Sequence, residues 1–139
     1  GGVYQAGTLS GNPVAVAAGL KTLEIIQRPG FYEQLAKHTQ MLCHGLDAVA
    51  KEAGLPFCSQ SVGGMFGLYF ADAVPQSYAE MAASNTEHFK QFFHGMLDHQ
   101  IAFGPSAFEA CFMSAAHTPE HIADTIGVAA EAFTQMVRG

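Results

Sequence analysis

Positively charged side chains are scarce in this chain. Only six of its 139 residues are Lys or Arg, against twelve Asp and Glu, which gives a formal net charge of −6. Nucleic acids and anionic membranes are bound through clusters of basic side chains that neutralise phosphates. Because the sequence has no basic stripe, we expect neither a nucleic acid nor a membrane as partner.

Cysteines and long apolar runs are also few. The three cysteines, Cys43, Cys58 and Cys111, are too scattered for a disulfide framework and form no C-x-x-C pair. Reduced, intracellular thiols are the simpler interpretation. No apolar run approaches the roughly 20 residues that cross a bilayer, and no signal sequence is visible. The first residue is Gly and not Met, so we expect the natural N-terminus to be missing. The absence of a signal sequence here then says nothing about the full protein.

Apolar residues, in contrast, are abundant. The hydrophobic set makes up 49% of the chain and charged residues only 13%, against roughly a quarter charged in an ordinary soluble domain. One compact, well-buried domain is expected at this length. Apolar area left over once the core is full usually marks an interface. We therefore expect a missing partner.

The start of the chain predicts a loop followed by a helix. Residues 1–11 are rich in Gly and hydroxyl side chains, which favours a loop. Asn12 can cap a helix whose first residue is Pro13, and the helix should run to about Gln27. Residues 14–20 are apolar or small on every side, so this half of the helix is expected to be buried.

The rest of the chain predicts an α/β (α+β) fold with a small, mostly antiparallel sheet. A helix from Phe31 should end near Gly54, and two strands at 57–62 and 65–71 should form a hairpin. Later elements are a helix that begins with a Ser84 and Glu87 capping box, short strands at 101–103 and 108–114, and a last helix from Thr118-Pro119.

Three stretches of the sequence carry a family resemblance. They are VYQAGTLSGNP at 3–13, VGGMFG at 62–67, and PSAFEA at 105–110 followed by SAAH at 114–117. Together they resemble the glutamate-1-semialdehyde aminomutases of the class III aminotransferase group, over the last third of that family's length. The chain departs from the family at Cys111 and Gln100, where the family usually has Gly, and Cys111 is expected to crowd the pocket near Glu109.

The resemblance implies the C-terminal part of a fold-type I enzyme that uses pyridoxal 5'-phosphate (PLP) and works as a homodimer. It implies a loop from the large PLP domain at 1–12, a connecting helix at 13–28 and a C-terminal small domain at 29–139. The intact enzyme would convert (S)-4-amino-5-oxopentanoate to 5-aminolevulinate in tetrapyrrole (porphyrin, heme) biosynthesis. A cytoplasmic location follows for a bacterial enzyme, and a plastid form stays open.

Gly7 and Thr8 are the candidate cofactor-binding residues. In the family, the threonine that matches Thr8 reaches the PLP phosphate of the other subunit. A Thr beside Gly offers a phosphate its hydroxyl and accessible backbone N–H groups. Without the resemblance, a simple turn before a capped helix is the commoner explanation of this pair.

Glu109 is the candidate substrate-binding residue. On a strand it would point away from Phe108 and Phe112, toward solvent or a cleft. A solvated carboxylate is the ordinary fate of a Glu. It resembles, however, a family glutamate near the substrate, where related aminotransferases carry an arginine that grips a carboxylate. A Glu there would repel a 2-oxo acid and attract the amines of a diamino intermediate.

No residue of the chain is a good candidate for the Schiff-base lysine that PLP chemistry requires. Lys21, Lys37, Lys51 and Lys90 all fall in predicted helices, outside the matching motifs. The resemblance places that lysine upstream, so we expect no catalytic residue here, no PLP held by this piece alone and no activity. Two alternatives remain: a class III aminotransferase with a separate 2-oxo acid acceptor, and a non-catalytic interaction domain.

A metal site is a weaker hypothesis. His117 and His121 have the i, i+4 spacing of some helical zinc sites. Pro119 places the start of the helix between them, and no third ligand has a supporting motif. We therefore expect no metal.

Overall fold

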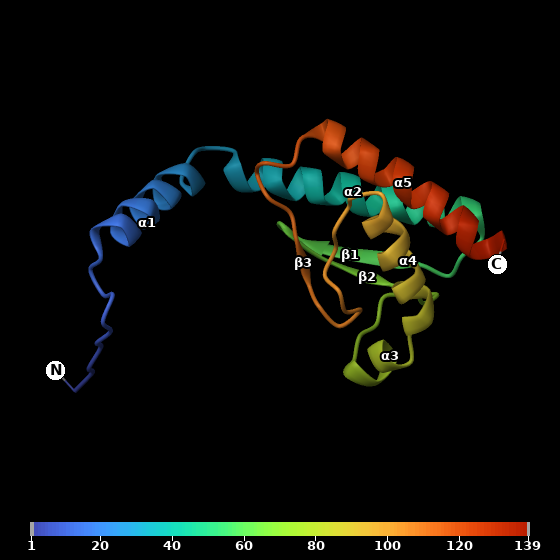
Figure 1. The fold of residues 1–139 in the computed structure, drawn as a ribbon, viewed down its shortest axis with the longest axis horizontal. Coiled ribbons are helices and arrows are strands. Elements are labelled where there is room, and N and C mark those ends of the chain that lie inside the picture. Colours follow the sequence, from blue (N-terminus) through green and yellow to red (C-terminus); the bar gives the residue numbers. More distant parts are fainter. Residues whose placement is uncertain (1, 139) are drawn as a thin grey trace. The chain divides into compact units, whose positions relative to one another are not determined.

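The computed structural model describes residues 2–138 and divides into two compact units. The first unit ends at Phe31 and the second begins at Tyr32. Figure 1 labels α1, which belongs to the first unit, and the elements of the second. The division predicted at residues 12 and 28 remains a prediction.

The first unit holds a single described helix, α1 (Pro13–Ile26). Its predicted cap is confirmed, because the Asn12 side chain accepts hydrogen bonds from the backbone N–H groups of Val14 and Ala15, both at 3.1 Å. The expected burial of its first half is not found within this unit. No α1 residue is buried, and Val14 and Leu20 are 77% and 63% exposed.

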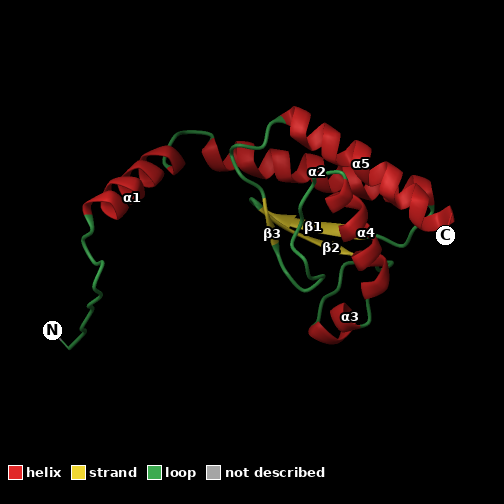
Figure 2. Ribbon diagram, in the orientation of Figure 1, coloured by secondary structure: helices red, strands yellow, loops and turns green. Residues whose placement is uncertain are grey.

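The second unit combines helices with one small sheet, as Figure 2 shows. Its elements are α2 (Phe31–Ala53), β1 (Cys58–Val62), β2 (Met65–Tyr69), α3 (Tyr78–Ala82), α4 (Thr86–Asp98), β3 (Cys111–Phe112) and α5 (Pro119–Arg138). The predicted α+β class is confirmed.

The sheet has three strands in the order β1-β2-β3, and both pairings are antiparallel. The predicted hairpin is confirmed: Val62 pairs with Met65 across a two-residue turn in which Gly63 has a φ of 58°. The Gly64 carbonyl of this turn accepts a hydrogen bond of 2.7 Å from the Met113 N–H. The turn is thereby tied to the chain that follows β3.

The core lies between one face of the sheet and the helices of this unit. Phe66, Leu68 and Phe70 alternate along β2 and its end, and each is at most 5% exposed. Phe92 of α4 stacks on Phe133 of α5 with ring centroids 5.0 Å apart. Burial of one such side chain stabilises a fold by about 1.5–3 kcal/mol.

Gly45 of α2 lies directly against the Ile126 side chain of α5. A Cβ added to Gly45 would overlap the end of the Ile126 side chain and lie 2.7 Å from its Cγ1. Real Cβ atoms do not come so near another carbon. Glycine at this position therefore sets the separation of the two helices.

One polar group of the core is poorly satisfied. Asp47 of α2 has a buried Oδ1 that forms no hydrogen bond within residues 2–138, and the same holds for the hydroxyl of Ser59. Burial raises the pKa of the Asp47 carboxyl, and the neighbouring Ser59 and the charge of His44 oppose this effect only in part. The charged form of Asp47 is thus disfavoured in the folded chain.

The start of α4 differs from its prediction. Asn85 caps the helix by accepting a hydrogen bond of 2.9 Å from the His88 N–H. Ser84 donates its hydroxyl to the Met81 carbonyl instead, at 2.7 Å. The capping box of Ser84 and Glu87 is therefore wrong by one residue, because the short helix α3, which the sequence did not predict, uses Ser84 at its own end.

The predicted strands at 101–103 and 108–114 are largely wrong. Residues 101–103 form no strand, and only Cys111 and Phe112 pair in the second. A turn precedes them, in which the Glu109 N–H donates to the Ser106 carbonyl at 3.0 Å. The turn changes the phase of the alternation, so Met113 is 8% exposed and Phe112 is 70% exposed.

Gln100 ends α4 in a left-handed conformation, with a φ of 64°. The Ile101 N–H returns to the Met96 carbonyl at 3.0 Å, a helix end at which Gly is usual. The departure from Gly at this position therefore has a conformational cost. Within the described part of the chain, no helix is both long and apolar enough to cross a membrane.

Candidate functional site

Two of the matching sequence stretches meet at one groove in the second unit. The groove has a volume of about 480 Å³ and is lined by Val62, Met65 and Gly67 from one stretch and by 107–110 from the other. About 40 residues of chain separate these stretches. The hairpin turns its core residues to the opposite face of β2, which leaves Met65, Gly67 and Tyr69 on the groove side.

The groove has an aromatic rim. The rings of Tyr78 and Phe108 lie 6.0 Å apart, and these residues are 79% and 51% exposed. Tyr69 leans over Gly67, where an added Cβ would come within 2.6 Å of the tyrosine Cζ. Burial raises the pKa of Tyr69. Its neutral hydroxyl is a donor and acceptor beside the groove.

Glu109 alone is charged among the described residues that line this groove. It is exposed and is the last residue of the turn at 105–109, so its direction does not come from strand alternation. Phe108 lines the same groove, although the sequence predicted opposite faces for the two. Glu109 thus lies at a cleft, as one of its two expected placements required, and its role remains a prediction.

Cys111 lies on the other side of this segment from the groove. It lines a second cavity of about 310 Å³ whose walls include Leu42, Phe103 and Ile122. Burial raises the pKa of the Cys111 thiol, a backbone contact from Gly104 opposes this effect, and the charge of Glu109 adds to it. Cys111 is not among the residues that line the groove, so the expected crowding of that pocket is not observed.

Gly7 and Thr8 lie in the first unit, in a turn before the cap of α1. The Ser10 N–H donates to the Gly7 carbonyl at 2.9 Å, and a Cβ on Gly7 would come within 3.0 Å of the Ser10 hydroxyl oxygen. Thr8 is exposed. The turn offers two hydroxyls and unobstructed backbone beside Gly7, which fits the phosphate end of PLP. Their role as phosphate ligands remains a prediction.

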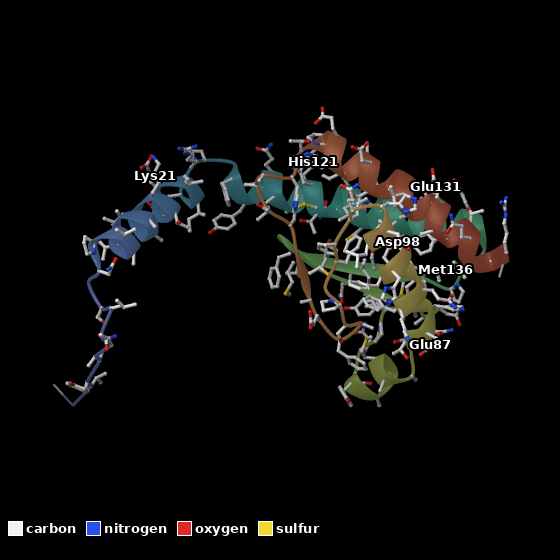
Figure 3. The ribbon with its side chains drawn as sticks, in the orientation of Figure 1. Lys21, Glu87, Asp98, His121, Glu131 and Met136 are labelled. Carbon is white, nitrogen blue, oxygen red and sulfur yellow. The ribbon has the colours of Figure 1, made fainter. Side chains whose placement is uncertain are left out.

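The four lysines lie in helices, as predicted, and all are exposed. Lys21, marked in Figure 3, forms an ion pair with Glu24 at 2.7 Å. None of the four lines the groove that contains Glu109. Among the described residues, the groove is therefore lined by an acid and by no lysine.

The two histidines of the metal hypothesis each accept a backbone hydrogen bond near the start of α5. The Ser114 N–H donates to Nδ1 of His117 at 3.0 Å, and the Thr118 N–H donates to Nδ1 of His121 at 3.2 Å (Figure 3 marks His121). In a neutral imidazole this leaves the proton on Nε2. Among residues 2–138, no group of three or more His, Cys, Asp and Glu is arranged to hold a metal ion.

Gln60 and Tyr69 line the groove but were not singled out from the sequence. Both lie on predicted strands, where Gln60 pairs with Gly67 and directly opposed residues share a face. Alternation from Gly67 therefore contained the signal that could have found them.

Known proteins similar to this chain are glutamate-1-semialdehyde 2,1-aminomutases of bacteria. The protein of that name from Neisseria meningitidis serogroup B is 67% identical over 136 residues, which cover 98% of this chain and 32% of the relative. Those from Neisseria gonorrhoeae and Laribacter hongkongensis are 68% and 59% identical over the same share of each chain. The chain thus spans about a third of the length of these relatives. No family model matches it.

Solved structures similar to this one are transaminases. An omega-transaminase from Sphaerobacter thermophilus has a TM-score of 0.79 and 22% identity over 99% of this chain and 31% of its own. A β-phenylalanine aminotransferase from Variovorax paradoxus has a TM-score of 0.78 and 21% identity over 100% and 31%. These structures show the fold, which is part of the fold of type I PLP transaminases.

The similar structures indicate only a fold, whereas the sequence identity indicates one family. It extends over nearly all of this chain in relatives from several bacteria that bear one name. It also agrees with the resemblance carried by the matching stretches, two of which meet at the groove. The chain therefore belongs to the glutamate-1-semialdehyde 2,1-aminomutase family, as a segment about one third as long as its relatives.

Proposed function

We propose that this chain is the part of a glutamate-1-semialdehyde 2,1-aminomutase that supplies a phosphate contact and a substrate-facing acid. The intact enzyme would convert (S)-4-amino-5-oxopentanoate to 5-aminolevulinate. The observation that supports this best is the groove, because it unites two family stretches around one carboxylate, that of Glu109. A homodimer in the cytoplasm is the assembly and location that the resemblance implies for the intact enzyme.

Glu109 would select the substrate by charge. A carboxylate in a partly apolar groove attracts protonated or hydrogen-bond-donating amines and repels another carboxylate. An aminomutase benefits because the amino group then stays on one carbon skeleton. The neutral Tyr69 hydroxyl and the Gln60 amide can orient a polar substrate beside this acid.

Gly7 and Thr8 would hold the phosphate of PLP. When bound, PLP supplies the electron sink that lets an amino group move between carbons. Thr8 contributes its hydroxyl, and Gly7 leaves the approach free of a side chain. These two residues position the cofactor and take no part in proton transfer.

The activity can be tested in a chimera. The 136 matching residues of the Neisseria meningitidis relative are replaced by this chain, and formation of 5-aminolevulinate is measured. We expect a rate close to that of the relative. An inactive chimera that is folded and binds PLP would contradict the proposal.

The roles of the site residues are tested in the same chimera. Glu109→Gln is expected to lower kcat/KM about 10- to 100-fold, the loss that follows removal of a charged substrate contact. Thr8→Val is expected to weaken PLP binding. Glu131→Gln, an exposed carboxylate of α5 seen in Figure 3, is the matched control and should change neither value.

Exchange with a 2-oxo acid separates the proposal from an ordinary aminotransferase. The chimera should transfer its amino group to added 2-oxo acids slowly, and Glu109→Gln should speed this exchange. Rapid exchange by the unmodified chimera would favour the aminotransferase alternative. The isolated chain, mixed with PLP and reduced with borohydride, should show only sparse, nonspecific lysine labelling.

A further inference from the structure

Gly104 lies against the side chain of Glu109. A Cβ placed on Gly104 would be 3.1 Å from Oε2 of Glu109 and 3.4 Å from its Cβ. The same added atom would be 3.7 Å from Sγ of Cys111. The side chains of Glu109 and Cys111 therefore both border the space that Gly104 leaves empty.

Glu109 has little freedom to leave this position by moving its backbone. Its N–H is bonded to the Ser106 carbonyl at 3.0 Å, and Cys111, two residues later, is paired with Phe66 in the sheet. A methyl group at residue 104 would thus displace the end of the glutamate side chain and not the chain that carries it. A contact of 3.1 Å between carbon and oxygen is already close.

We propose that Gly104 is a positioning residue: because it has no side chain, the Glu109 carboxylate can lie against it, on the flank that Cys111 also borders, while Glu109 lines the groove. The proposal deepens the proposed function, because it rests on Glu109 as the substrate-facing acid. It assigns to Gly104 a role in substrate selection that acts through Glu109. Gly104 itself lines the cavity beside Cys111, not the groove.

Cys111 provides a reporter for the position of this carboxylate. Burial raises the pKa of the Cys111 thiol, a contact from the Gly104 backbone lowers it, and the negative charge of Glu109 raises it. Alkylation proceeds through the thiolate, so its rate as a function of pH reports how near the carboxylate is. The other two cysteines are resolved from Cys111 by mass spectrometry of the alkylated peptides.

The first experiment compares the 139-residue chain with four variants of it. We expect Glu109→Gln to move the midpoint of Cys111 alkylation to lower pH, with a rate about twofold higher near pH 7.5. Gly104→Ala should move it in the same direction, because it displaces the carboxylate. Adding Gly104→Ala to Glu109→Gln should cause no further shift. Gly127→Ala, whose added Cβ meets no atom within 4 Å, is the matched control and should leave the midpoint unchanged.

The second experiment tests the proposal even if the Gly104→Ala chain folds poorly. Unfolding by urea is compared in the original chain and in Glu109→Ala, where the crowded carboxylate is absent. We expect Gly104→Ala to lower the unfolding midpoint clearly in the first background and much less in the second. Equal losses in both backgrounds, or a Gly104→Ala shift of the Cys111 midpoint that persists in Glu109→Gln, would overturn the proposal.

These measurements need no substrate, so they fail separately from the proposed function. If Glu109→Gln leaves the chimera fully active, the proposed role of Glu109 is wrong. The alkylation of Cys111 can still show that Gly104 positions the carboxylate. If neither variant shifts the midpoint of Cys111 alkylation, the positioning role of Gly104 is wrong, and Glu109 keeps its proposed role as the substrate-facing acid. In an active chimera, Gly104→Ala should reduce kcat/KM in the same direction as Glu109→Gln and have no added effect in that variant.

Discussion

Both units of the chain carry large apolar side chains, but only the second buries them. In the first, Leu20 is 63% exposed and no residue of α1 is buried. In the second, Leu46 is fully buried in a core of helices and strands. A helix gains most of its stability from the face it packs. The second unit thus has a packed core of its own, whereas the helix of the first has no buried residue.

A matched pair of Leu→Ala variants gives the largest expected effect. Leu46→Ala should lower the free energy of unfolding by about 2–5 kcal/mol, because it opens a cavity in the core. Leu20→Ala should change it by less than about 0.5 kcal/mol. Urea denaturation followed by circular dichroism measures both. Equal losses would show that the first unit is packed after all.

Two glycines with nearly the same φ offer a pair without side-chain contacts. Gly11 in the first unit has a φ of 77° and Gly54 in the second has 76°, and an added Cβ meets no atom within 4 Å at either. Gly54→Ala should cost about 1 kcal/mol of unfolding free energy, the strain of a left-handed residue. Gly11→Ala should leave the unfolding midpoint of the second unit unchanged. A loss at Gly11 would contradict the independence of the units.

Asp47 tests whether the core of the second unit is fully optimised. Because burial raises the pKa of this carboxyl, its contribution to stability is present below the ordinary value near 3.9 and is lost as pH rises through the folded value. Asp47→Asn should therefore raise stability at pH 7, by up to about 1 kcal/mol, and flatten its pH dependence. Asp124→Asn, an exposed residue of α5, is the control. Unchanged pH dependence in Asp47→Asn would refute this reading.

The smallest expected effect is at the end of α4. Gln100→Gly should stabilise the second unit by about 0.5 kcal/mol, since relief of the left-handed strain exceeds the entropy that glycine adds to the unfolded chain. His99→Gly is the control, because His99 has a φ of −98° and gains no relief. Thermal unfolding should give a higher melting temperature for Gln100→Gly than for the original chain, and a lower one for His99→Gly.

The sequence was sufficient where a local signal and the tertiary structure agreed. Asn12 and Pro13 start α1 as predicted, and Gly63-Gly64 forms the turn of the hairpin. These features depend on backbone chemistry within a few residues. The groove could be anticipated only in part: the matching stretches named its two walls, but their meeting depends on the pairing of β2 with β3.

The errors arose where neighbouring elements compete for the same residues. Ser84 has the chemistry of a helix cap, yet it serves the end of α3, and Asn85 takes the start of α4. Phe112 is apolar, yet the turn at 105–109 shifts the strand phase and leaves it exposed. Such choices depend on which of the competing contacts fit the complete fold, and a pattern in one window of sequence does not contain that information.

Gly45 has a consequence for how this chain tolerates change. Its hydrogen atom faces Ile126, so even the smallest replacement would act as a wedge between α2 and α5. Six residues connect β3 to α5. The first of these, Met113, donates its N–H to the Gly64 carbonyl. A side chain at residue 45 that displaced α5 would therefore also displace β3, the strand that follows Glu109. A substitution at residue 45 would in this way act on the segment beside the groove, although Gly45 does not line the groove.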